Sequence, residues 1–311
     1  MTDTTIGIDI SKDTLDVHRL PSGESRVFAN DRTGHRALLK WIGRGVERVV
    51  YEPTGRYHRA LERTLDQAGL PLVKVNPLRA RRFAESYGQL AKTDARDAAM
   101  LARMGVIFDL SPRPVADKRL DLLRELYVAR TALIKDRTAA KNRAQGLTIA
   151  VLKKQNAQRL AQIKSQLEAI EAEIVALIAK DADLVRKCDI LLSIPGIAMT
   201  TATAMIIEMP ELGALGGKQI AALAGVAPFV RESGKWKGKA KIKGGRASLR
   251  QALYMPALVA TRYNPDLEAK YQHLIAKGKP AKLAITAVMR KLLTTANALI
   301  RDDRTWTETI A

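Results

Sequence analysis

Strands and helices alternate over the first 112 residues, and this pattern limits the possible folds more than any other feature of the chain. Apolar and polar residues alternate in 5–10 (TIGIDI) and again in Thr14–Leu20, which predicts a β-hairpin. Ser25–Ala29 is a possible third strand. Further along, predicted helices and short apolar strands take turns: helices at 33–43, 57–68, from 77 and at 93–104, strands at 46–51 and 70–75. Thr33 and Thr93 are the predicted N-caps of two helices. This order predicts an α/β layer with a mixed sheet.

The remainder of the chain has helical patterns. The prolines in 111–115 (SPRPV) predict a linker, and 117–185 is almost entirely helical by its spacing. A heptad seam runs along it through Leu160, Ile163, Leu167, Ile170, Ile174 and Leu177. Such a seam suits an intrachain helical hairpin or a dimer contact equally well. Helices are also predicted at 249–262 and 282–301, and the chain divides into domains at 1–112, 113–188 and 189–311.

The net charge points to a polyanionic partner. Lys and Arg total 52 against 32 Asp and Glu, a formal net charge of +20. The excess is uneven: +4 over 1–112, +5 over 113–185 and +11 over 186–311. Nucleic acid is the common polyanion that relieves such self-repulsion, and the C-terminal third is the strongest candidate to bind phosphates.

Several other classes of protein fit the sequence poorly. The single cysteine, Cys188, cannot form an intrachain disulfide, and the four histidines show no zinc-ligand spacing. No stretch approaches the roughly 20 apolar residues of a membrane span, and no signal peptide is visible. We therefore expect a cytosolic protein with no membrane partner.

Four carboxylates form a candidate metal site. Asp9 lies in the middle of a predicted strand, where a carboxylate is unfavourable unless it faces a cleft. Glu52 ends another strand, and Asp94 and Asp97 share one face of a helix. Hard oxygen ligands suit Mg²⁺, and two such ions about 4 Å apart can clamp a phosphodiester. The alternative is that each is a surface charge or, for Asp94, a first-turn acid that stabilises its helix.

A rival explanation of the N-terminus is the actin-like sugar-kinase and ATPase fold, which also opens with a Gly-x-Asp hairpin. There the hairpin is rich in glycine because its backbone cradles phosphates. Here Ile10-Ser11-Lys12 follow Asp9 without a glycine. The basic charge also fits a nucleotide kinase poorly, so we rank this explanation below a nuclease-type site.

Two segments of the last third are candidates for phosphate contacts. The turn 194–197 (IPGI) resembles half of a helix-hairpin-helix motif, in which Gly196 would expose backbone N–H groups to DNA, or it is a plain packing corner. The segment 231–246 is predicted as a loop with seven basic residues and one acid. Trp236 could stack there on a base, and Ser233 is either one more loop serine or a nucleophile beside the cations Arg231 and Lys235.

Taken in order, several short motifs resemble one family. The sequence is similar to the DEDD transposases of the insertion-sequence family one-ten, which include the bridge-RNA-guided recombinases. The matching stretches span nearly the whole chain and read Gly7-Ile8-Asp9, Tyr51-Glu52-Pro53-Thr54-Gly55, Asn76-Pro77, Lys92-Thr93-Asp94-Ala95-Arg96-Asp97-Ala98, Ser193-Ile194-Pro195-Gly196-Ile197, Arg231-Glu232-Ser233-Gly234 and Leu249-Arg250-Gln251-Ala252-Leu253-Tyr254-Met255-Pro256-Ala257.

The resemblance implies a RuvC-like, RNase H-type domain at 1–112. Asp9, Glu52, Asp94 and Asp97 would there hold Mg²⁺ or Mn²⁺. It implies a coiled-coil dimerisation segment at 113–188 and a mostly helical transposase domain at 189–311. In that last domain Ser233 would attack DNA and form a covalent phosphoserine link, acting with the acidic site, often across subunits.

The resemblance also implies partners and a place in the cell. The protein would form dimers or tetramers on a structured noncoding bridge RNA that pairs with donor and target DNA, in the bacterial or archaeal cytoplasm at the nucleoid. The residues expected to contact nucleic acid are Gly196, Arg231, Lys235, Trp236, Lys237, Lys239, Lys241, Lys243 and Arg246.

The reading favoured by the sequence is a transposase that excises and inserts its own element. One alternative is a junction-resolving nuclease in which the acidic site activates water and Ser233 is idle. A second is a nucleic-acid-binding protein with a degenerate, inactive site.

Overall fold

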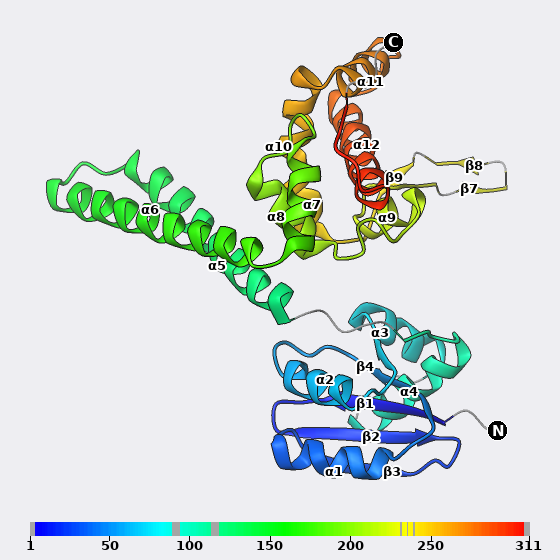
Figure 1. Cartoon of the computed structure of the whole chain (residues 1–311). Coiled ribbons are helices and arrows are strands. Elements are labelled where there is room, and N and C mark those ends of the chain that lie inside the picture. Colours follow the sequence, from blue (N-terminus) through cyan, green and yellow to red (C-terminus); the bar gives the residue numbers. More distant parts are fainter. Residues whose placement is uncertain are drawn as a thin grey trace. The chain divides into compact units, whose positions relative to one another are not determined.

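The computed structural model describes residues 4–88, 94–112, 118–230, 232–234, 236–238 and 240–307. The side chains of Asp94, Lys118, Trp236 and Lys237 are outside that description. The chain forms two compact units, residues 1–116 and 117–311 (Figure 1). The predicted boundary at 112 falls close to the division between these units, whereas the predicted boundary at 188 falls inside a helix. The predicted linker 111–115 lies mostly outside the described residues.

The first unit is built on a five-stranded mixed sheet, as predicted. Its strands are β1 (Thr4–Ile10), β2 (Thr14–Leu20), β3 (Ser25–Ala29), β4 (Val46–Tyr51) and β5 (Leu72–Lys74), and their order is β3-β2-β1-β4-β5. β1 pairs in parallel with β4, and β4 with β5, while the first three strands form an antiparallel meander. The carboxyl ends of β1 and β4 therefore meet at one edge of the sheet.

Helices cover both faces of this sheet. α1 (Arg32–Ile42) and α2 (His58–Gln67) pack against the face that carries Ile6, Ile8 and Tyr51. α3 (Pro77–Ser86) and α4 (Asp94–Ile107) share a second core with Val50 and Val73 on the other face. The unit thus has three layers, which is consistent with an RNase H-like fold.

Helix starts differ in part from the predicted caps. Asp31, not Thr33, caps α1: its carboxylate accepts a hydrogen bond from the Gly34 N–H at 2.7 Å, and Thr33 lies within the first turn. A carboxylate at the cap also complements the helix dipole, an advantage that a hydroxyl lacks. Asn76 caps α3 just before Pro77, and Thr93 is outside the described residues.

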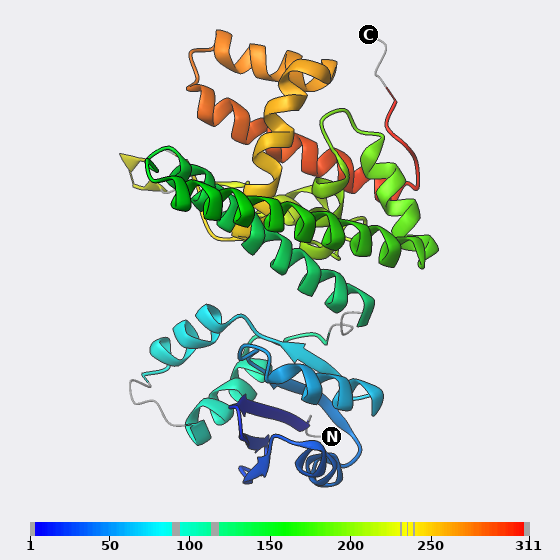
Figure 2. The ribbon, with the colours of Figure 1, turned by 90° about the vertical axis from the view of Figure 1, so that its left-hand side faces the viewer.

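The second unit begins with a long helical hairpin. α5 (Lys118–Ala144) and α6 (Ala150–Ala179) run antiparallel and pack against each other (Figures 1 and 2). Ile163, Leu167 and Ile174 of the heptad seam are buried within the chain. The seam therefore serves the intrachain hairpin, and dimerisation through this segment stays a prediction.

The other helices surround a single core. They are α7 (Ala182–Leu192), α8 (Met199–Glu208), α9 (Gly217–Leu223), α10 (Ala247–Tyr263), α11 (Pro265–Ala276) and α12 (Ala281–Arg301). Both helices predicted near the C-terminus are present. Contrary to the expectation from the sequence, α12 has the length and hydropathy of a membrane span. It packs against α7, α9, α10 and α11, however, and half of its apolar window is buried. It is the central core helix of this unit.

A two-stranded β-arm replaces the predicted cationic loop. β6 (Pro228–Phe229) pairs with β9 (Lys241–Ile242), and β7 (Glu232–Ser233) pairs with β8 (Trp236–Lys237), all antiparallel. The arm projects from the helices near α9 (Figure 1). We call residues 228–242 the serine arm.

Candidate active site

Asp9 and Glu52 occupy neighbouring positions at the carboxyl edge of the sheet. β1 and β4 are parallel, and Ile8 is opposite Tyr51 in their register. The residue that follows Ile8 is Asp9, still on β1, and the residue that follows Tyr51 is Glu52, immediately after β4. Because side chains alternate between faces, both carboxylates belong to the face opposite Ile8 and Tyr51, which is the face that α3 and α4 cover.

The glycine of the Gly7-Ile8-Asp9 motif explains why α4 comes so close to that face. A Cβ at Gly7 would lie 2.0 Å from the Ala98 carbonyl oxygen and 2.5 Å from the Ala102 nitrogen. Only a residue without a side chain permits this approach of helix to strand. Asp97 precedes Ala98, so the same contact holds it beside the strand edge that carries Asp9.

Arg48 fixes the other end of α4. Its buried guanidinium donates a hydrogen bond to the Gly105 carbonyl at 2.7 Å and pairs with Asp109 at 3.0 Å. Burial is the largest single influence on the pKa of Arg48 and lowers it. The hydrogen bonds and charge contacts with Glu47 and Asp109 together outweigh burial, so the pKa is raised. The sequence alone did not single out Arg48, because it follows Glu47 in a strand and its partners Gly105 and Asp109 lie about 60 residues further along the chain.

Three of the four predicted acids line one open cavity of about 810 Å³. Asp9 and Glu52 lie at its sheet side, Asp97 on α4, and Pro77 and Arg81 of α3 close the opposite wall. Each of the three carboxylates is partly exposed. The side chain of the fourth, Asp94, falls outside the described residues.

Carboxylate oxygens are the donors that a hard divalent cation prefers, so the chemistry of this set fits Mg²⁺ or Mn²⁺. Among the residues that the structure describes, however, no three acidic, His or Cys side chains are close enough to hold an ion together. Asp9 and Glu52 come from the carboxyl edge of the sheet and Asp97 from α4.

A further acid, which the sequence alone did not single out, lies next to Asp9 in the sheet. Asp16 on β2 is directly opposite Asp9 in the antiparallel register. Opposite residues in such a pair share a face, with Cβ atoms roughly 4.5–5.5 Å apart, and like charges there destabilise the sheet. The added negative charge makes this edge more attractive to a cation.

Ser233 lies in the other unit, beside the turn of the serine arm. It pairs with Trp236 across the arm, and only two residues separate the strands. The first of these, Gly234, has φ +56°, a left-handed conformation that glycine adopts without strain. Ser233 is exposed, as are Lys241 and Lys243 near the base of the arm. Arg231, Lys235 and Lys239, together with the side chains of Trp236 and Lys237, lie outside the described residues.

Close backbone packing holds the base of the arm. A Cβ at Gly245 would lie 2.2 Å from the Gly225 nitrogen, and one at Gly225 would lie 2.2 Å from the Gly244 oxygen. Arg250 donates a hydrogen bond to the Gly244 carbonyl at 2.8 Å. The segments at Gly225 and at Gly244–Gly245 therefore touch through their backbones, and this contact holds the base of the arm in place.

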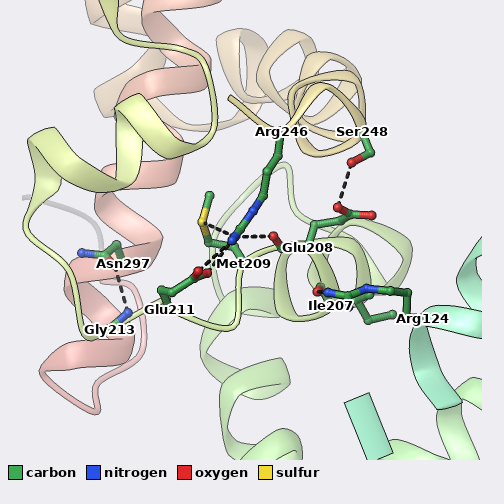
Figure 3. A network of polar contacts seen from close by, with 9 residues as sticks. All are labelled: Arg124, Ile207, Glu208, Met209, Glu211, Gly213, Arg246, Ser248 and Asn297. Atoms are coloured by element: carbon green, nitrogen blue, oxygen red, sulfur yellow. Dashed lines mark hydrogen bonds and ion pairs between the residues drawn. The ribbon is translucent and has the colours of Figure 1, made fainter. Parts of the chain in front are cut away.

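Arg246, just after the base of the arm, points toward Glu208, Met209 and Glu211 at the end of α8 (Figure 3). Its guanidinium forms a two-pronged ion pair with Glu211, both distances 2.7 Å, and donates to the Glu208 carbonyl at 2.6 Å. These contacts use three of the five N–H donors of the guanidinium within the protein. Arg246 therefore stabilises the fold, and its contact with nucleic acid stays a prediction.

Gly196 also has a packing reason for its identity. Its φ is +101°, and a Cβ would lie 2.9 Å from the Pro256 carbonyl and 3.0 Å from the Ala260 Cβ on α10. The alternative of a packing corner thus accounts for this glycine. A DNA contact at the turn stays a prediction.

Comparison with known proteins identifies the family of this chain. Residues 6–151 match the DEDD transposase model of the IS110 type, and residues 188–272 match the model described as the Transposase IS116/IS110/IS902 family. The chain is 31% identical to the pilin gene-inverting protein of Moraxella bovis, over 98% of both chains. It is 27% identical to the insertion element IS900 uncharacterized 42 kDa protein of Mycobacterium paratuberculosis, over 91% of this chain and 78% of the relative.

These matches cover both units in sequence order, including the acidic edge and the serine arm. The family implies dependence on a divalent metal ion and DNA as the substrate. The chain belongs to the IS110 family of transposases and is a DNA transposase or recombinase.

Proposed function

We propose that the protein excises and inserts its element through a serine–DNA intermediate, with Ser233 as nucleophile and Asp9, Glu52, Asp94 and Asp97 as the ligands of Mg²⁺ or Mn²⁺. The observation that carries the metal half is the register of β1 and β4, which makes Asp9 and Glu52 neighbours on the cavity that Asp97 also lines. The nucleophile half is supported by the exposure of Ser233 beside the turn of a cationic arm.

The chemical step exchanges one phosphate ester for another. The Ser233 Oγ attacks the phosphorus of a DNA strand and loses its proton, while the bond from phosphorus to one deoxyribose oxygen breaks and that oxygen takes up a proton. Attack by a DNA hydroxyl on the phosphoserine then reverses the exchange and joins new strands, so no energy source is required. A bound divalent ion would stabilise the negative charge that develops on the phosphate oxygens.

The protein's own cations assist in this proposal. Lys241 and Lys243 are exposed near the base of the arm, and Arg231, Lys235, Lys237 and Lys239 follow the same segment in sequence. Their charges would neutralise phosphate oxygens, and Trp236 would stack on a base. Guidance by a structured bridge RNA and assembly into dimers or tetramers at the nucleoid are further parts of the proposal, supported by the basic charge and the family resemblance.

The test uses a suicide DNA substrate that carries the element ends, incubated with the protein and Mg²⁺ and run on a denaturing gel. We expect a DNA–protein adduct that Ser233→Ala abolishes. Ser165→Ala, which removes an exposed hydroxyl from α6, is the matched control and should leave the adduct unchanged. Asp9→Asn should abolish cleavage and lower the protein's affinity for Mn²⁺ in calorimetry.

The two alternatives predict different gels. A junction-resolving nuclease would cleave without an adduct and would keep its activity in Ser233→Ala. A purely binding protein would show neither cleavage nor sensitivity to Asp9→Asn. Either result would contradict the proposed serine intermediate.

A further inference from the structure

The α5–α6 hairpin has a sharp division of charge along its length. Its distal half, residues 135–164, carries eight basic residues and one acid, Asp136. The proximal half, residues 118–134 and 165–179, carries four basic residues and five acids. The two halves are of similar length, so composition alone does not explain the contrast. We call residues 135–164 the hairpin tip.

The cations of the hairpin tip are directed at solvent rather than at protein carboxylates. Seven of the eight are exposed, and Arg137 is half-buried. Within the described part of the chain, only Lys164 comes within ion-pair distance of a carboxylate, at 3.8 Å from Glu168. In the proximal half, by contrast, Arg119 and Arg130 pair with Asp181 and Glu171, both at 2.7 Å. The proximal charges thus stabilise the protein, whereas the tip concentrates charge of one sign.

Such a concentration destabilises the folded protein unless a polyanion is bound. The fifteen residues of α6 within the tip span about 22 Å at 1.5 Å per residue. Duplex DNA carries one phosphate per about 1.7 Å of its axis, so about 13 phosphates fall within that length. The charge and the size of the tip therefore suit the backbone of one DNA segment.

We propose that the hairpin tip is a docking surface for duplex DNA, separate from the acidic cavity and the serine arm. Lysine and arginine contacts to phosphates position a duplex without reading its sequence. DNA is the occupant because it is the polyanion on which this family acts. The inference rests on that family activity and not on the role proposed for Ser233.

The experiment measures binding of a fluorescent 30-base-pair DNA by anisotropy over a series of salt concentrations. The tip variant replaces four exposed residues of the full chain: Lys141→Gln, Arg143→Gln, Lys153→Gln and Lys154→Gln. The matched control removes the same charge from exposed positions elsewhere in the second unit: Lys180→Gln, Lys270→Gln, Lys277→Gln and Lys282→Gln. Thermal unfolding of both variants verifies that they fold.

We expect the tip variant to bind DNA at least tenfold more weakly, with a salt slope reduced by about 3–4, since each lost phosphate contact lowers that slope by about 0.9. The control should change affinity much less. Equal losses in both variants would mean that net charge alone matters and would overturn the proposal. Loss of binding to duplex RNA but not to DNA would also overturn it.

The tip exposes Ile149 and Val151 as well, so a second copy of the chain is the competing occupant. Analytical ultracentrifugation of the tip variant tests this: a changed oligomeric state with unchanged DNA affinity would overturn the proposal. Failure of the proposed serine mechanism would give a different result from failure of the tip proposal. If the serine mechanism is wrong, Ser233→Ala retains the adduct or the cleavage, while the tip variant still binds DNA more weakly.

Discussion

Gly7→Ala tests the packing that holds the acidic edge together. The new Cβ would lie 2.0 Å from the Ala98 carbonyl oxygen, and ordinary contact begins at 3.4 Å, so α4 must move away from β1 by about 1.4 Å. Overpacking of this kind typically costs about 1–3 kcal/mol of stability.

The same shift would carry Asp97 away from Asp9. Catalytic groups tolerate displacements of roughly 0.5 Å, and a misplacement of about 1 Å can cost on the order of 100-fold in rate. We therefore expect Gly7→Ala to fold, to unfold at lower urea concentration, and to lose about 100-fold of its metal-dependent strand cleavage.

Cleavage of the suicide substrate and urea unfolding measure the two effects. Gly217→Ala is the matched control, because its Cβ would lie 3.7 Å from the nearest atom, an ordinary contact, and should leave both measurements unchanged. Full stability and full activity in Gly7→Ala would refute the described contact between β1 and α4. Normal activity in a destabilised variant would show that the position of Asp97 does not matter for the chemistry.

Three further predictions concern residues outside the cavity. Arg246→Met should lower the free energy of unfolding by about 1–3 kcal/mol, because it removes the hydrogen bonds that Arg246 donates to Glu211 and to the Glu208 carbonyl. Lys243→Met should leave urea unfolding nearly unchanged and weaken DNA binding instead. The opposite pattern would support the predicted phosphate contact of Arg246. Glu62 is buried on the sheet face away from the cavity, where it accepts a hydrogen bond from the Tyr51 hydroxyl and pairs with Lys74 at 2.5 Å. Glu62→Gln should therefore lower the free energy of unfolding, measured in urea, by about 1–2 kcal/mol without slowing cleavage. A variant that is fully stable but inactive would place Glu62 in the mechanism. Burial lowers the pKa of His35 from its ordinary 6.5, so the unfolded chain binds a proton at this residue more readily than the folded chain does. The free energy of unfolding should therefore fall as the pH is lowered from about 6.5 through the folded pKa. His35→Gln should flatten that part of the pH profile, and an unaltered slope would contradict the role of His35.

Much of the first unit could be predicted because its signals are local. Strand alternation in 5–10 and Thr14–Leu20 and the position of Pro77 at a helix start follow from short-range chemistry. The neighbouring positions of Asp9 and Glu52 needed one further inference, that parallel strands end at a common edge. The role of Gly7 could not be predicted, since it depends on α4, which is about 90 residues further along the chain.

The second unit was harder to predict because its key contacts are distant in sequence. Lysines alternate with other residues over 235–243, which is a strand pattern, but the glycines and the charge favoured a loop. These segments are strands because they pair with each other across the arm, and the sequence of one segment does not show which other segment it pairs with. The structural contacts of Arg246 could not be predicted for a similar reason: its acceptors at Glu208 and Glu211 lie about 35 residues earlier in the chain.

The heptad seam of α6 has a consequence for assembly. Since α5 already occupies that seam, the hairpin is complete within one molecule and its folding is a first-order process. The unfolding midpoint of this segment should therefore be independent of protein concentration, unlike that of a coiled-coil dimer, which rises with concentration by mass action. Dilution would then separate any assembled copies while each hairpin stays folded. If copies of this protein assemble as proposed, they can therefore dissociate without unfolding of the hairpin.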